Sequence, residues 1–140
     1  MATRGSLGGL SMAVSHAVKL LDAFGKDIII VETVGAGQTE LDVRQIADIL
    51  VLVLIPGYGD AMQVIKAGPI EVADIIVVNK ADQGRVEWLV TELEENKKHS
   101  QTVLTIQAIN GTGVEGLFDE IERRHSQHEN NRHKDTANDE

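Results

Sequence analysis

The sequence contains no cysteine, few aromatic residues and fewer basic than acidic side chains. The absence of cysteine excludes disulfide bonds and thiolate metal sites. Aromatic residues make up only 3% of the chain, so aliphatic side chains must form most of its core. The formal net charge of −9 argues against nucleic-acid partners and anionic membrane surfaces, because both need a positive field.

Long apolar runs are absent as well. The sequence has no stretch of about 18 apolar residues and no signal peptide, so it predicts a protein of the cytoplasm without a membrane partner. A chain of 140 residues is long enough to form one domain and to bury a sizeable core.

Short apolar runs alternate with segments in which apolar residues recur at helical spacing. The predicted strands are 28–32, 49–55, 75–78 and 102–106. The predicted helices begin near Ser11, Asp60, Val86 and Val114, with a short helix or turn over 40–48. This alternation predicts an α/β fold of three layers, with helices on both faces of a mainly parallel sheet. Residues 125–140 have almost no apolar side chains and are predicted to form a disordered tail.

The segment from Asp27 to Gln38 joins an apolar run to a glycine-rich turn. Its β-branched run predicts a strand buried on both faces, and Glu32 stands at the end of that strand. Open α/β sheets bind their ligands at the carboxyl ends of strands, so Glu32 is a candidate site residue. The alternative is a buried strand that ends in an ordinary tight turn.

The sequence Asn79-Lys80-Ala81-Asp82 follows the predicted strand 75–78. The carboxylate of Asp82 can accept hydrogen bonds from N1–H and the exocyclic amine of guanine, a donor pair that adenine lacks. Asn79 can bind the base or hold neighbouring loops together, and the stem of Lys80 can lie along the purine ring. The alternative is a surface turn that binds nothing.

The loop that contains Ala108 follows the next predicted strand, so it is expected at the same edge of the sheet. A backbone N–H near Ala108 can then donate to the carbonyl of guanine. The same loop contains Asn110-Gly111, a common turn sequence, and by itself it needs no ligand.

Four motifs, in this order, resemble the MeaB/ArgK family of GTPases. The motifs are Arg4-Gly-Ser-Leu-Gly-Gly-Leu10, Glu32-Thr-Val-Gly-Ala-Gly-Gln38, Pro56-Gly-Tyr-Gly-Asp60 with Gln63 and Lys66, and Asn79-Lys-Ala-Asp82. The resemblance implies a partial P-loop NTPase (G) domain over 1–124, ahead of the tail 125–140. It also implies a GTP-hydrolysing G-protein chaperone whose partner is an adenosylcobalamin-dependent acyl-CoA mutase, such as methylmalonyl-CoA mutase.

The resemblance also implies roles for single residues. Glu32 would support the Mg²⁺ ion beside bound GTP or GDP, since a hard cation prefers oxygen ligands. Gly35 would place a backbone N–H near the γ-phosphate. Gln63 and Lys66 match the switch loop through which the mutase stimulates hydrolysis, where a lysine can offset transition-state charge. Without the resemblance, Lys66 is more simply an exposed lysine of a helix.

The phosphate-binding loop is a point at which the sequence departs from the family. A phosphate-binding loop, G-x-x-x-x-G-K-[ST], should precede the motifs, and no such string occurs in the 140 residues. We therefore expect the C-terminal part of a G domain that is inactive alone, and the resemblance allows a homodimer in the complete protein. Two alternatives remain: a nucleotide-independent interaction module that keeps the fold, and the family's older assignment as a transport ATPase or kinase.

Overall fold

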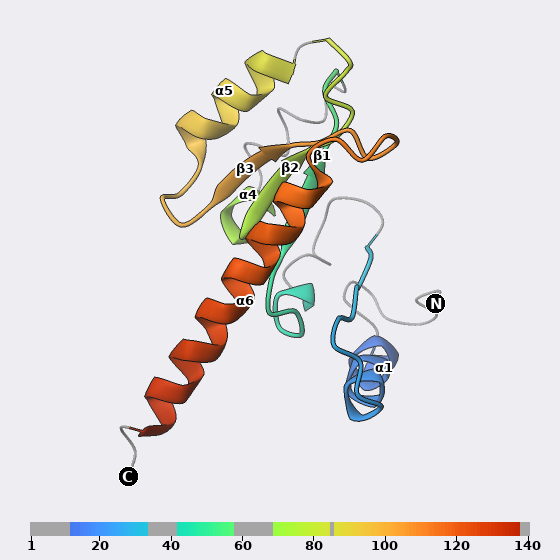
Figure 1. Cartoon of the computed structure of the whole chain (residues 1–140), viewed down its shortest axis with the longest axis vertical. Coiled ribbons are helices and arrows are strands. Elements are labelled where there is room, and N and C mark those ends of the chain that lie inside the picture. Colours follow the sequence, from blue (N-terminus) through green and yellow to red (C-terminus); the bar gives the residue numbers. More distant parts are fainter. Residues whose placement is uncertain (1–11, 34–41, 58–68, 85, 138–140) are drawn as a thin grey trace. The chain divides into compact units, whose positions relative to one another are not determined.

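The computed structural model describes residues 12–33, 42–57, 69–84 and 86–137 (Figure 1). The chain divides into two compact units, 1–47 and 48–140. Across the described ranges, no helix is both long and apolar enough to cross a membrane.

The first unit contains helix α1 (Met12–Ala23), which ends where the sequence predicts. Gly25 has a φ of 72°, and its N–H donates to the Asp22 carbonyl at 2.8 Å. The Lys26 N–H donates to the Leu21 carbonyl at 3.2 Å. This pair of bonds is a Schellman motif, which uses a left-handed glycine to satisfy the last carbonyl groups of a helix.

The prediction of a strand at 28–32 is wrong. Residues 28–33 belong to no strand, and the side chains of Ile28 and Ile30 are 65% and 88% exposed. A β-branched run sets only a preference for extended backbone, whereas a strand also needs a hydrogen-bonded neighbour. The predicted short helix or turn over 40–48 is confirmed in its described part, where the Ala47 N–H donates to the Val43 carbonyl at 2.9 Å.

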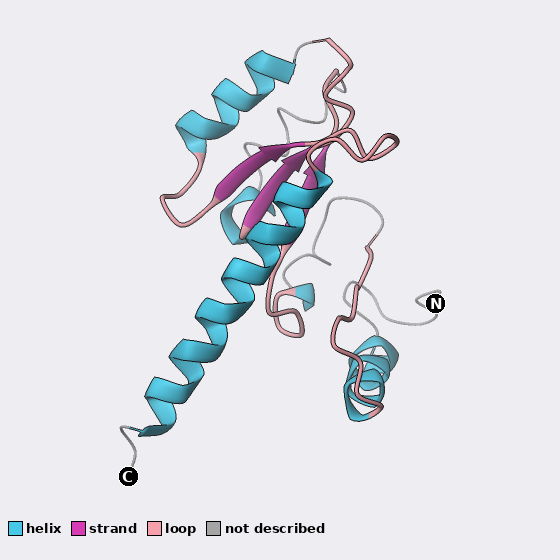
Figure 2. Cartoon of the chain, viewed as in Figure 1, coloured by secondary structure: helices cyan, strands magenta, loops and turns pink. Residues whose placement is uncertain are grey.

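The second unit is built on a parallel sheet of three strands, in the order β1-β2-β3 (Figure 2). Its strands are β1 (Val51–Leu54), β2 (Ile75–Val78) and β3 (Thr102–Thr105), which confirms three of the four predicted strands. The register places Val51 level with Ile75, and Ile75 level with Thr102. The parallel α/β class predicted from the sequence is therefore confirmed.

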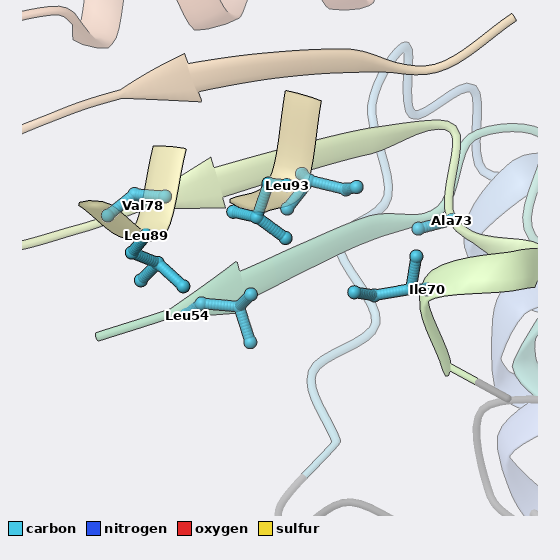
Figure 3. Close-up of a cluster of buried hydrophobic side chains, with 7 residues drawn as sticks. Leu54, Ile70, Ala73, Val78, Leu89 and Leu93 are labelled. Atoms are coloured by element: carbon cyan, nitrogen blue, oxygen red, sulfur yellow. The ribbon is translucent and has the colours of Figure 1, made fainter. Parts of the chain in front are cut away.

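Helices cover both faces of this sheet (Figure 1). Helices α4 (Pro69–Val72) and α5 (Val86–Asn96) pack on one face, and α6 (Val114–Ala137) packs on the other. Side chains alternate between faces along a strand, so β2 supplies both layers of the core. The α5 face buries Leu54, Ile70, Ala73, Ile76, Val78, Leu89 and Leu93 (Figure 3). The α6 face buries Ile75, Val77 and Ile106 against the partly buried Leu117 and Ile121.

A buried polar side chain, Gln101, joins the start of β3 to α4 and to the segment just before β2. Its Nε2 donates to the carbonyl oxygens of Ile70 and Ala73, the latter at 2.7 Å. Its Oε1 accepts from the Lys98 N–H at 2.7 Å. Both ends of the amide are satisfied, which offsets the cost of burying it.

Helix α6 is longer than the sequence predicts, because it continues to Ala137 through the segment predicted to be disordered. After Gly116 the sequence contains neither glycine nor proline, so nothing in the backbone stops the helix once its first turns are packed. The prediction of a disordered tail rested on composition alone, which did not indicate that the helix continues. The domain boundaries, 1–124 and 125–140, stay predictions.

Glu120 attaches α6 to the start of β3. Its carboxylate accepts hydrogen bonds from Thr102 Oγ1, Arg123 Nε and Arg124 Nε, each at 2.7 Å. Arg124 also donates to Thr102 Oγ1 at 3.0 Å. The hydrogen bond from Arg123 is the main cause that lowers the pKa of Glu120 from 4.5 to about 2; partial burial opposes it, and Thr102 and Arg124 reinforce it.

We predict that Glu120→Gln lowers the free energy of unfolding by about 1–2 kcal/mol at neutral pH, because it removes the charge from these hydrogen bonds. The folded pKa of about 2 lies below the ordinary 4.5, so the carboxylate stabilises the fold above pH 4.5. That contribution is lost as the pH falls from 4.5 toward 2. Urea unfolding followed by circular dichroism across this range measures the difference.

The matched control is Glu94→Gln on α5. Glu94 pairs with Lys97 at 2.8 Å, but its side chain is 46% exposed. Its removal should cost less than about 0.5 kcal/mol. Equal effects of the two substitutions, or a Glu120 effect that does not change with pH, would contradict the assignment.

Candidate functional site

The candidate site lies where β2 and β3 end. The turn 79–84 follows β2 and the loop 107–112 follows β3, and both stand at the carboxyl edge of the sheet (Figure 1). The backbone ladder continues one residue past each strand: the Asn79 N–H donates to the Leu54 carbonyl at 2.8 Å, and the Ile106 N–H donates to the Val78 carbonyl at 2.9 Å. Both segments therefore start from fixed positions at the edge where open α/β sheets bind ligands.

Asn79 joins the two segments through its side chain. Its Oδ1 accepts hydrogen bonds from the Lys80 N–H at 2.8 Å and from the Ala108 N–H at 3.1 Å. The two predicted site residues Asn79 and Ala108 are thus brought together. Because two donors hold Oδ1, the orientation of the amide is fixed, and Nδ2 is left as a donor with no acceptor among the described residues.

The turn itself is held tightly against the end of β3. The Ala81 N–H donates to the Ile106 carbonyl at 3.1 Å, and the Gln83 N–H donates to the Lys80 carbonyl at 2.9 Å. Lys80 has a φ of 58°, a left-handed conformation that is uncommon for a residue with a Cβ atom. The side chain of Asp82 is exposed in this turn, so its carboxylate can accept hydrogen bonds from a ligand.

Gly113 sets the position of the loop 107–112, and the sequence reasoning missed it. Its φ is 77°, and a Cβ atom built on it would collide with the Thr105 carbonyl oxygen and lie 3.3 Å from Ile106. Only glycine therefore lets the chain turn back against the end of β3 and enter α6. A glycine just before an amphipathic helix is the signal that could have indicated this close approach.

Four further predicted site residues belong to other parts of the chain. Glu32 is exposed in the unit 1–47. Gly35, Gln63 and Lys66 lie outside the described residues. The part of the chain that the structure describes holds no group of three or more His, Cys, Asp or Glu side chains able to bind a metal ion.

The groups at the carboxyl edge suit the polar rim of a heterocyclic base. Asp82 offers two acceptor oxygens and the Nδ2 of Asn79 offers a donor, so together they complement a ring that carries two donors and a separate acceptor. The Ala108 N–H is already engaged by Asn79. An acceptor on a ligand would have to share that N–H or replace Asn79 as its partner.

Comparison with known proteins gives an independent view of the whole chain. The sequence model of the family described as "Methylmalonyl Co-A mutase-associated GTPase MeaB" matches residues 1–140. A Pyrococcus horikoshii protein named as a GTPase is 48% identical over 131 residues, which cover 86% of this chain and 41% of that protein. A Mycobacterium tuberculosis protein, also named as a GTPase, is 39% identical over 132 residues, covering 86% and 39% of the two chains.

A mouse relative is named "Methylmalonic aciduria type A homolog, mitochondrial". It is 36% identical over 138 residues, which cover 91% of this chain and 33% of the mouse protein. The chain therefore spans less than half the length of the relatives that it matches.

We predict that Gly113→Ala destabilises the protein by about 1–3 kcal/mol, because the new methyl group meets backbone atoms and the residue must keep a positive φ. Thermal unfolding measures the loss. The matched control is Gly116→Ala within α6, where nothing lies within 4 Å of the added atom. Alanine favours a helix there, so the control should gain about 0.5–1 kcal/mol. Similar stability of the two variants would argue against a fixed approach of Gly113 to β3.

Proposed function

Because the chain belongs to the MeaB family of methylmalonyl-CoA mutase-associated GTPases, we propose that its carboxyl edge recognises the guanine base of GTP and GDP. Within a complete G domain this recognition would serve GTP hydrolysis and a G-protein chaperone role toward an adenosylcobalamin-dependent acyl-CoA mutase. The observation that carries the proposal is the hydrogen bond from the Ala108 N–H to Asn79 Oδ1. It joins two candidate base-binding segments that are 29 residues apart in sequence.

Asp82 would select the base. Its exposed carboxylate can accept from both N1–H and the exocyclic amine of guanine. At the same two positions adenine presents the N1 acceptor and a C2–H, so it would leave the carboxylate without a hydrogen-bond donor in the complex. Leaving a charged group without a partner is costly, and such a site discriminates steeply between bases.

Asn79 and Lys80 would orient the ring. With Oδ1 held by two backbone N–H groups, the Nδ2 of Asn79 is the end of the amide that can donate to a ring nitrogen. The left-handed backbone of Lys80 turns the chain sharply at the end of β2, and its exposed aliphatic stem can lie along the purine face. Backbone strain at a candidate site supports a functional role for this residue.

The residues for phosphate and metal remain proposals that rest on the family resemblance. Glu32 supplies one exposed carboxylate oxygen ligand of the kind that Mg²⁺ prefers. Gly35, Gln63 and Lys66 would contact or sense the γ-phosphate. The 140 residues contain no G-x-x-x-x-G-K-[ST] string, so this chain by itself is proposed to recognise the base rather than to hydrolyse the nucleotide.

We predict that Asp82→Asn weakens GDP binding on the order of 10–100-fold and shifts the preference from guanine to xanthine, because asparagine offers a donor to the xanthine carbonyl. Amide shifts in NMR titrations with GDP, xanthosine diphosphate and ADP measure the three affinities. We expect base contacts alone to give a dissociation constant of about 1 mM. The nucleotide concentrations in the titrations therefore extend above that value.

The control for this substitution is Asp119→Asn on the exposed side of α6, which makes the same chemical change away from the site. It should leave all three affinities unchanged. An unaltered guanine preference in Asp82→Asn would remove the base-selecting role. Failure of the unmodified chain to bind GDP at all would favour the nucleotide-independent interaction module.

A further inference from the structure

Asn110 lies in the exposed loop 107–112, and both ends of its side-chain amide are used within that loop. Its Nδ2 donates to Gln107 Oε1 at 2.8 Å, and its Oδ1 accepts from the Thr112 N–H at 3.0 Å. Its backbone N–H donates to the Gln107 carbonyl at 3.2 Å. An exposed asparagine whose side-chain oxygen and nitrogen both form hydrogen bonds within its own loop restrains the backbone of that loop.

These bonds close the loop into a ring. The Gln107 N–H donates to the Thr112 carbonyl at 2.9 Å, and the Gly111 N–H donates to the Gln107 carbonyl at 3.0 Å. Side-chain burial contributes little to its order, because Ile109 is 97% exposed and Asn110 is exposed as well. Hydrogen bonds within the loop are therefore the main interactions that hold its shape.

The ring carries the N–H group that fixes Asn79. Ala108 is the residue after Gln107, and its N–H donates to Asn79 Oδ1 at 3.1 Å. That distance is near the long end of the range for a good N–H···O bond, so a shift of the loop by about 1 Å would break it. Loss of the bond would release one of the two donors that orient the Asn79 amide.

We propose that Asn110 is a positioning residue for base recognition, and that it acts through Ala108 and Asn79 without touching the ligand. The inference rests on the proposed function, since the ligand is the guanine base. Asn110 closes the loop, the loop places the Ala108 N–H, and that N–H orients the Nδ2 donor of Asn79. Asn110 contributes by ordering the site before the base arrives, and it adds no contact of its own to the base.

The test compares Asn110→Ala with Asn96→Ala in the full chain. Asn96 is also exposed and also donates from Nδ2 within its own element, to the Glu92 carbonyl at 2.7 Å. Asn110→Ala should weaken GDP binding about tenfold and lower hydrogen-exchange protection of the Ala108 amide by a similar factor. Its guanine-over-xanthine preference should stay, because Asp82 is intact. Asn96→Ala should change neither the affinity nor the protection of Ala108.

A double-substitution cycle with Gln107→Ala separates positioning from a general loss of stability. The two residues share one hydrogen bond, so their effects on GDP affinity should be clearly less than additive. Asn110→Asp keeps the acceptor for the Thr112 N–H and loses the donor to Gln107, so it should fall between the wild type and alanine. This variant decides the question if the alanine variant does not fold.

Failure of the inference and failure of the proposed function give different results. If the wild-type chain and Asn110→Ala bind GDP equally well, the inference is overturned and the proposed function stands. If the wild-type chain does not bind GDP, the proposed function falls and the inference falls with it. Weaker binding with full protection of the Ala108 amide would also overturn the inference, because the loop would then have kept its place.

Discussion

The double burial of β2 is the constraint on which the rest of the second unit depends. All four side chains of Ile75–Val78 are fully buried, two against each helical layer, and both edges of the strand are hydrogen-bonded to parallel neighbours. A shift of one residue would exchange the two faces, so the register of the sheet is strongly determined. Asn79 follows directly, and its position at the edge is set by that register and not by contacts of its own turn.

The candidate site depends on this core for position and on polar contacts for shape. Its two segments come from different strands, they bury few side chains, and a small number of hydrogen bonds centred on Asn79 and Asn110 gives them their form. A rigid sheet that carries exposed polar loops is the usual arrangement for recognition, because the loops can meet a ligand without disturbing the core. The close approach of Gly113 to the Thr105 carbonyl joins the polar loop 107–112 to the end of β3.

The sequence predicted those features whose causes are local. The apolar runs of β1, β2 and β3 and the helical spacing of α5 specify their own elements, and both are observed. The run 28–32 was misassigned because strand formation also needs a partner, and no pattern within the run shows whether one is present. Gly113 and Asn110 were missed because their roles arise from neighbours in the fold, the Thr105 carbonyl and the ring of bonds in the loop.

Base recognition and phosphate binding make different demands on such a domain. Charged phosphates and a metal ion supply most of the attraction in a nucleotide complex, and any nucleoside triphosphate carries them alike. A guanine site therefore contributes through discrimination, which depends on the donors and acceptors being in place before the base arrives. In the proposed site, the fixed amide of Asn79 and the exposed carboxylate of Asp82 would meet that demand within one edge of a three-stranded sheet. Under the proposed function, this part of the fold would select the base, and hydrolysis would depend on other parts of a complete G domain.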